Sequence, residues 1–167
     1  MVRRGIGPTL YRVSGLEIRD ERYDSAVAQR LISAALADLA ARYGGSGDET
    51  PVAADEFVPP AGTFLVAYLD GEPVGCAGWR SHGDTGEVAE LKRLYVSPAV
   101  RGRGIARAVL AAVEESARRH GRRRLILECG DRQPEAIALY QSSGFERIPD
   151  FGYYRGSPSV LSFGRWL

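Results

Sequence analysis

The chain has 167 residues, of which 44% are hydrophobic and 26% are charged, and its formal net charge at pH 7 is +1. These values are typical of a globular protein, and the length fits a single domain over residues 1–167. The small net charge gives no overall attraction to nucleic acid or to a membrane surface, and no run approaches the ~18 apolar residues of a membrane span.

Three short features suggest where such a chain resides and exclude some chemistry. The basic start, residues 1–5, is not followed by an apolar core, so we predict no secretion signal. Cys76 and Cys129 lie inside apolar runs, which predicts two reduced, buried thiols. No Cys or His spacing suits a metal ion. We therefore expect a cytoplasmic protein without a metal.

The predicted elements begin with a strand over 10–19 and a helix over 25–43, with Asp24 as its N-cap and Gly44 after its end. The next segment, 44–62, contains three prolines and predicts a loop with one helical turn near 53–57. It also carries four acidic residues, which give it a negative bias: Asp48, Glu49, Asp55 and Glu56.

The rest of the chain alternates strands and helices. The Asp70-Gly71 turn predicts a hairpin, because Asp-Gly suits the tight turns of hairpins. The elements expected here are strands over 63–69, 73–80 and 87–96, a helix over 102–120, a strand over 124–129, a helix over 133–143, and strands over 145–148 and 159–166. This order predicts a mixed α/β sheet with helices on both faces, in which the strands flanking the second helix are parallel neighbours.

Five arginines crowd the end of that second helix, at 118, 119 and 122–124. We interpret them mainly as compensation of the helix dipole and as a solvated turn. The alternative is that part of the cluster reaches a nucleotide phosphate or an acidic partner.

The segment 96–106 is the most informative part of the chain. It ends a strand, turns, and opens an amphipathic helix through Gly102 and Gly104, flanked by Arg101 and Arg103. The first amides of a helix have no partner inside it and carry partial positive charge. Glycines let an anion approach the backbone. The sequence therefore predicts a diphosphate-sized anion site.

A second motif supports a family resemblance. Residues 101–106 fit the pattern Arg/Gln-x-x-Gly-x-Gly/Ala, and residues 133–145 resemble Asn-x-x-Ala-x-x-Leu-Tyr-x-x-x-Gly-Phe, with Gln133 in place of asparagine. Both resemble the GNAT N-acetyltransferases, in the family's order and at a fitting separation. The resemblance implies a GNAT-like acyl-CoA N-acyltransferase fold, whose mostly antiparallel mixed sheet contains a splayed parallel pair, and acetyl-CoA as co-substrate without a metal. The residues that it implies for the cofactor are Leu94, Tyr95, Val96, Arg101, Gly102, Arg103, Gly104, Ile105, Ala106, Gln133, Ala136 and Tyr140.

The resemblance also implies catalytic roles. Glu90 lies where some family members carry the base that takes the proton of the amine. Strand alternation groups it with Lys92 and Leu94 on one face, so an ion pair with Lys92 or an arginine is the alternative. A base acting through water, or Glu128 or Glu87 in its place, also remains open. Tyr140 is the expected proton donor to the leaving thiolate, or else a packing tyrosine. The Val96 amide is the expected oxyanion donor.

The acceptor is less constrained by sequence. The acidic segment 44–62 favours a cationic amine. Aromatic residues of the tail, Phe151, Tyr153 and Tyr154, are expected to line its pocket, with Arg155 for a carboxylate. The leading hypothesis is a primary amine of a small molecule, including an amino acid or another zwitterion. The alternatives are a protein or peptide acetyltransferase and a non-catalytic acyl-CoA-binding domain. Homodimers are frequent in the family, so the resemblance makes a homodimer an expectation.

Overall fold

The computed structural model describes residues 11–13 and 15–167, and it contains one eight-stranded mixed sheet with the order β1-β2-β3-β4-β5-β6-β8-β7. Only β5 and β6 pair in parallel; the other neighbours in this sheet are antiparallel. The fold expected from the sequence is therefore confirmed. The strands are β1 (Tyr11–Val13), β2 (Leu16–Glu21), β3 (Gly62–Leu69), β4 (Glu72–His82), β5 (Val88–Val96), β6 (Arg124–Gly130), β7 (Glu146–Arg147) and β8 (Val160–Trp166).

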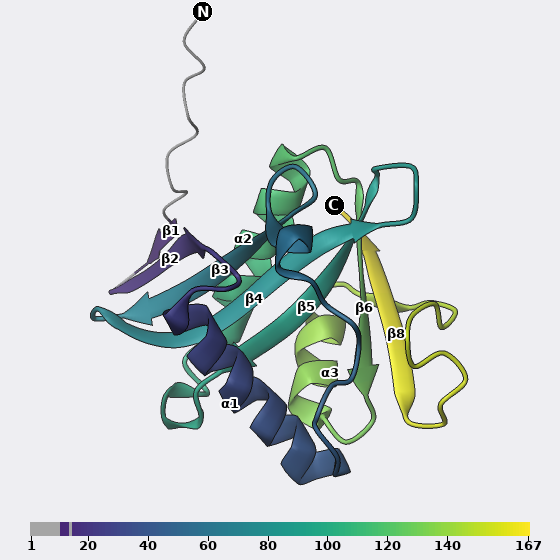
Figure 1. Ribbon diagram of the computed structural model, residues 1–167, viewed down its shortest axis with the longest axis horizontal. Coiled ribbons are helices and arrows are strands. Elements are labelled where there is room, and N and C mark those ends of the chain that lie inside the picture. The colour runs from purple at the N-terminus through teal and green to yellow at the C-terminus, as the bar shows by residue number, and fades with distance from the viewer. Residues whose placement is uncertain (1–10, 14) are drawn as a thin grey trace, which may run out of the picture.

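Helices cover both faces of the sheet, as Figure 1 shows. One core lies between the sheet and the helices α2 (Ile105–Arg119) and α3 (Pro134–Ser142). The other lies under α1 (Ala26–Tyr43) and the 3-10 turn η1 (Ala54–Phe57). None of the helices in the described residues is long and apolar enough to cross a membrane.

The first predicted strand proves to be two. Residues 10–19 were expected to form one strand, but β1 (Tyr11–Val13) and β2 (Leu16–Glu21) pair with each other as an antiparallel hairpin. Gly15 has a φ of 81°, which lets the chain reverse. Residues 1–10 and 14, including the predicted start of this strand and the segment judged not to be a secretion signal, lie outside the described residues.

Two helix ends also differ in detail from expectation. Ser25 caps α1, because its Oγ accepts a hydrogen bond from the Ala28 amide, while Asp24 binds Arg22 instead. At the end of α2, Arg122 donates to the carbonyls of Gly86 and Pro60. That arginine therefore holds loops together, which agrees with a structural role for this part of the cluster.

The parallel pair β5–β6 separates after only three paired positions, from Val88–Arg124 to Glu90–Ile126. In Figure 1 the two strands diverge below this point, and α3 lies between them. The rest of β5, residues 91–96, has no partner on that side in the described sheet. This opening is the splayed edge that the resemblance implied.

A bulge in β5 corrects the expected alternation of its side chains. The register with β4 shifts between Cys76 and Gly78, and Arg93 has a φ of 61°. The bulge turns Arg93 to the same side as Lys92, and Leu94 packs instead against the core beneath α2. Leu94 is thus not on the face of Glu90 and Lys92. Bulges are known to re-aim side chains beside functional sites.

Candidate active site

A cavity of about 280 Å³ lies where β5 and β6 separate. Three parts of the chain enclose it beside the strands: the end of α1, the start of the 44–53 loop, and the segment before β8. Its polar lining includes Tyr43, Asp48, Thr50, Lys92, Glu128, Gln133, Tyr154, Ser157 and Ser159. A pocket with a few converging polar groups is typical of a small-molecule site.

A second cavity, of about 110 Å³, adjoins the first along the open edge of β5. Leu94, Tyr95, Gln133 and Tyr140, four of the residues expected at the cofactor, line it. The residues shared by both cavities are Leu39, Asp48, Lys92, Glu128, Cys129 and Gln133. The two spaces therefore meet at Lys92 and Glu128.

Tyr140, on α3, is 6% exposed and lines the second cavity. Its ring packs near Phe145 and Phe163. Its hydroxyl makes no hydrogen bond within the described part of the chain, and burial raises the pKa of this phenol. The hydroxyl therefore stays protonated and is free to donate a hydrogen bond.

The loop before α2 presents its backbone openly. Gly102 and Gly104 have φ values of 77° and 78°, and nothing lies within 4 Å of the position of a Cβ at either residue. The Ile105 side chain is buried in the core, while that of Arg103 is exposed. The open helix start fits the diphosphate of acetyl-CoA.

Of the other residues expected at the cofactor, Arg101 is hydrogen-bonded within the protein, and Ala106 and Ala136 pack against the core. Arg101 donates through Nε to the Val96 carbonyl and lies 3.4 Å from Asp38 of α1, so it also braces the loop. Ala106 and Ala136 are half-buried against the core beneath α2. Neither of these two alanines lines the cavities described above.

The Val96 amide faces the open edge of β5. The neighbouring Ser97 amide donates to Val74 of β4. Because successive backbone groups of a strand point to opposite sides, the Val96 amide points away from β4, toward the splay. A pantetheine arm lying along this edge would find the Val96 amide there as a donor, while the Val96 carbonyl already accepts a hydrogen bond from Arg101.

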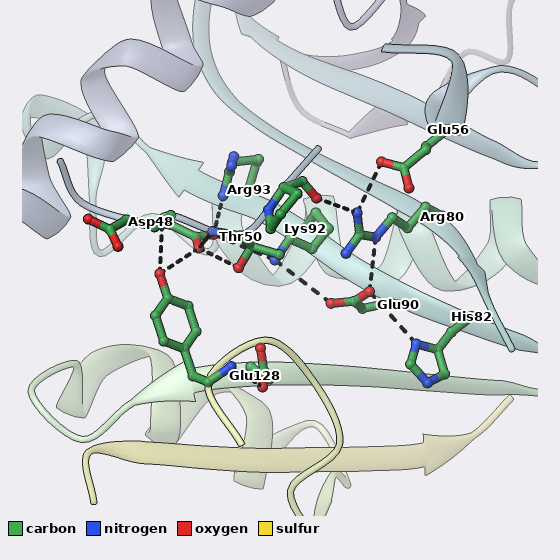
Figure 2. Close-up of polar contacts among 12 residues, drawn as sticks. Asp48, Thr50, Glu56, Arg80, His82, Glu90, Lys92, Arg93 and Glu128 are labelled. Atoms are coloured by element: carbon green, nitrogen blue, oxygen red, sulfur yellow. Dashed lines mark hydrogen bonds and ion pairs between the residues drawn. The ribbon is translucent and has the colours of Figure 1, made fainter. Parts of the chain in front are cut away.

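Glu90 is embedded in ion pairs. Its side chain is 5% exposed, and Oε2 accepts a hydrogen bond of 2.9 Å from Arg80, which also binds Glu56. Lys92 lies 3.7 Å from its other oxygen, and His82 lies 3.9 Å away. Figure 2 shows this row of charges. Glu90 lines neither of the two cavities.

The acidic loop is anchored through Asp48, which sequence reasoning treated only as part of a negative bias. Its carboxylate pairs with Arg93 and Lys92 and accepts hydrogen bonds from Thr50 and Tyr154. Burial opposes ionisation, but the charges of Lys92 and Arg93 outweigh it and hold the pKa of Asp48 at about 2. No spacing signal marks this contact, because 45 residues separate Asp48 from Arg93.

Glu128, on β6, was considered in the sequence analysis only as an alternative to Glu90 as the base. It lines both cavities, and its Oε1 accepts a hydrogen bond of 3.2 Å from the Tyr154 amide. Its Oε2 is buried and has no hydrogen-bond partner among the described residues. Burial raises the pKa of this carboxyl. Glu87, the other alternative, is exposed and lies 3.4 Å from Arg123.

Of the three aromatic residues expected to line the acceptor pocket, only Tyr154 lines the larger cavity. Tyr154 lines the first cavity, whereas Tyr153 is 54% exposed and Phe151 contacts His82. Arg155 is exposed and is not part of the cavity lining. The expected carboxylate contact of Arg155 therefore has no support in this arrangement. Cys129 also lines both cavities, but burial raises its pKa to about 12, which leaves it an inert thiol.

Among the residues that the structure describes, no cluster of His, Cys, Asp or Glu side chains is arranged to hold a metal ion. The polar groups of the two cavities are carboxylates, hydroxyls, the amide of Gln133, the ammonium of Lys92, the guanidinium of Arg93 and the thiol of Cys129. They suit proton transfer and hydrogen bonding.

Two curated proteins that are similar to this chain carry the names of acetyltransferases. The chain is 32% identical over 126 residues to the uncharacterized N-acetyltransferase YjgM of Escherichia coli. This match covers 70% of this chain and 75% of YjgM. It is 41% identical over 98 residues to the IAA acetyltransferase of Azospirillum brasilense. That match covers 59% of this chain and 63% of the Azospirillum protein, so the chain spans less than two thirds of that relative.

Solved structures share the fold. A candidate acyl-CoA N-acyltransferase from Klebsiella pneumoniae superposes with a TM-score of 0.74 at 29% identity, over 91% of this chain and 97% of that one. A GNAT family acetyltransferase from Elizabethkingia anophelis with acetyl-CoA bound gives a TM-score of 0.66 at 16% identity, over 93% and 100% of the two chains. The model of the Acetyltransferase (GNAT) family matches residues 27–145. Because that match covers more than half of the chain, including strands β3 to β6 and the splayed edge, the chain belongs to the GNAT family of acetyl-CoA-dependent N-acetyltransferases.

Proposed function

We propose that this protein transfers the acetyl group of acetyl-CoA to a primary amine of a small molecule, by direct attack while both substrates are bound. The observation that carries the proposal is the meeting of the two cavities at Lys92 and Glu128. The larger one has a volume of about 280 Å³ and is lined by several polar side chains, which suits a small acceptor.

The relatives agree with a small acceptor without identifying it. They include proteins named IAA acetyltransferase, N-acetylaspartate synthetase and aminoglycoside N(6')-acetyltransferase. The match covers only 36% of the human synthetase. The acceptors in these names differ from one another. The names therefore support acetyl transfer to a small molecule, and they do not point to one acceptor compound.

In the proposed mechanism the amine attacks the thioester carbonyl carbon. The carbon–nitrogen bond forms as the carbon–sulfur bond breaks. The Val96 amide donates a hydrogen bond to the carbonyl oxygen as negative charge develops there. The Tyr140 hydroxyl donates to the departing sulfur. Because its pKa is raised, Tyr140 acts by hydrogen bonding and by relaying a proton, since full ionisation of the phenol is unfavourable.

The amine must also lose a proton, because an ammonium has no free electron pair. Glu90 is the base proposed from the family resemblance. Since its carboxylate binds Arg80 and lines neither cavity, this role requires a water molecule between Glu90 and the amine. Glu90 also lies 3.7 Å from Lys92, which borders both cavities, so it positions that ammonium.

An amino acid or another zwitterion is a finer form of the same proposal. Lys92 is the one cation among the described residues that lines the larger cavity, so it would receive a carboxylate. Its ammonium already lies 3.5 Å from Asp48 and 3.7 Å from Glu90, however. An acceptor carboxylate would have to share or replace these contacts.

Release of free thiol from acetyl-CoA tests the proposal. The acceptors are alkylamines, amino acids and lysine-containing peptides, supplied one at a time. We expect turnover with at least one small amine and none with peptides. Turnover with peptides alone would favour a protein acetyltransferase. Tight binding of acetyl-CoA without any turnover would indicate a non-catalytic acyl-CoA-binding domain.

A further inference from the structure

A third cavity lies away from the acetyl-transfer site. Its volume is about 610 Å³, and it is bordered by the end of β2, the turn before α1, η1 and the start of β3. It shares no lining residue with the two cavities at the splayed edge. A ligand of this third cavity is therefore distinct from acetyl-CoA and from an acceptor bound beside the thioester.

Part of the lining of the third cavity is aromatic. The rings of Tyr23 and Phe57 stack with their centroids 4.6 Å apart, and the ring of Phe64 meets both of them edge-on. Val58 also lines the cavity, and it is 57% exposed. Such side chains can cover the apolar part of a ligand, and the face of an aromatic ring attracts a cation.

Another part of the lining is acidic. Arg22 is the one cation among the described lining residues, and Asp24 already binds its guanidinium through two hydrogen bonds of 2.8 Å. The carboxylates that line the cavity are those of Asp20, Glu21, Asp24 and Asp55. Because carboxylates outnumber cations there, the cavity attracts a positively charged ligand and repels an anion.

Thr63 gives a second and independent indication of a ligand. This residue lines the third cavity and is only 4% exposed. Its Oγ1 is buried and has no hydrogen-bond partner in the part of the chain that the structure describes. A buried hydroxyl without a partner is costly, so it requires an explanation. A hydroxyl oxygen can accept hydrogen bonds, and an ammonium has three to donate.

We propose that the third cavity binds an organic cation, a primary ammonium carried by an apolar group such as a phenylethyl unit. The ammonium donates hydrogen bonds to the carboxylates and to the Thr63 hydroxyl. The apolar group packs along Tyr23 and Val58. A neutral molecule of the same shape leaves the carboxylates without a compensating charge. This binding requires no acetyl transfer, so it is independent of the function proposed above.

Titration with 2-phenylethylammonium tests the proposal on the full chain, without any acetyl donor. Two-dimensional NMR of nitrogen-15-labelled protein follows the backbone amides. We expect saturable shifts of the amide resonances of residues 20–24 and 54–58. The amides of Asp48, Lys92 and Gln133 report on the two cavities at the splayed edge. Shifts confined to those three amides would overturn the proposal, because the probe would then occupy the acetyl-transfer site only.

Two further compounds test whether the charge matters. 2-Phenylethanol keeps the apolar group without the charge, and we expect it to bind about tenfold more weakly or less. 3-Phenylpropionate carries a negative charge and should cause no shifts at residues 20–24 and 54–58. Equal affinity for the ammonium and the alcohol would overturn the assignment of a cation site.

Two variants test the lining itself. Asp55→Asn, at an exposed position, should bind 2-phenylethylammonium about threefold to fivefold more weakly, as expected for a partly solvated charge pair. Thr63→Val keeps the shape of the side chain and removes the hydroxyl, so it should also weaken binding. Urea denaturation should show no loss of stability in Thr63→Val, because only an unsatisfied hydroxyl is removed.

Asp84→Asn is the matched control for these variants. Asp84 is exposed and lines none of the three cavities, so this variant should bind the probe as the wild type does. If Asp55→Asn and Thr63→Val also bind with the affinity of the wild type, the third cavity is not the site of binding and the proposal fails.

Discussion

Tyr140 illustrates how burial changes what a side chain does. A phenol in water ionises near pH 10, but at Tyr140 burial raises the pKa and the hydroxyl has no partner among the described residues. Such a group is inexpensive only if a ligand completes its hydrogen bond. The sulfur of acetyl-CoA, lying in the second cavity, would be that ligand.

Removing this hydroxyl separates binding from chemistry. In Tyr140→Phe we expect unchanged acetyl-CoA affinity, since the ring still packs near Phe145 and Phe163, and turnover lower by about tenfold or more. Calorimetry and thiol release measure the two quantities. Tyr153→Phe, at an exposed position outside both cavities, should match the wild type. Equal turnover in both variants would make Tyr140 a packing residue only.

The elements show which features a sequence reveals. The α2 helix was predictable because its apolar residues recur at helical spacing. Of these, Ile105, Val109, Ala112, Val113 and Ala117 are buried and Ala108 is half-buried. The bulge at Arg93 could not be predicted from the sequence, because a left-handed φ is uncommon outside glycine and no local sequence feature requires one. The Asp48 contacts were also hidden, since they join segments far apart in the chain.

At the start of α2, the open glycines predict a specific loss. Gly104→Ala places a side chain at a φ of 78°, which costs roughly 1 kcal/mol and tilts the first amides of the helix. We expect acetyl-CoA to bind about tenfold more weakly, which corresponds to 1.4 kcal/mol. Gly121→Ala is the matched control, because Gly121 follows the other end of α2 with a φ of 80° and equally open space.

Calorimetric titration with acetyl-CoA compares the two variants. Both should lose similar stability, since the backbone strain is alike. Only Gly104→Ala should lose affinity. Equal affinities would mean that the helix start does not hold the diphosphate.

For the molecule as a whole, ion pairs join the 44–61 segment, which borders the larger of the two active-site cavities, to the sheet. Asp48 binds Lys92 and Arg93 of β5, and Glu56 binds Arg80 of β4. Ion pairs therefore fasten the 44–61 segment to the sheet at two points, Asp48 and Glu56, although its prolines and glycines predicted a loose loop. The contacts that shape the cavity also stabilise the fold, so loop and sheet should respond together to acid.

Asp48→Asn tests this coupling. The pKa of Asp48 is 3.8 in an unfolded chain and about 2 in the fold, so its charge stabilises the fold by about 2 kcal/mol. Because the folded value is the lower one, this contribution is complete above about pH 4 and is lost as the pH falls toward 2. We expect Asp48→Asn to lower the free energy of unfolding at pH 6 by at least that amount, because Lys92 and Arg93 lose a partner.

Urea denaturation of both proteins between pH 6 and pH 2 measures the difference. It should shrink steadily below pH 4, as the wild type loses the Asp48 charge that the variant never had. Asp24→Asn removes an aspartate whose pair with Arg22 is exposed to solvent, and it should leave the pH dependence almost unaltered. A difference between wild type and Asp48→Asn that stays constant down to pH 2 would show that the Asp48 side chain supports the loop by its shape and hydrogen bonds, without its charge.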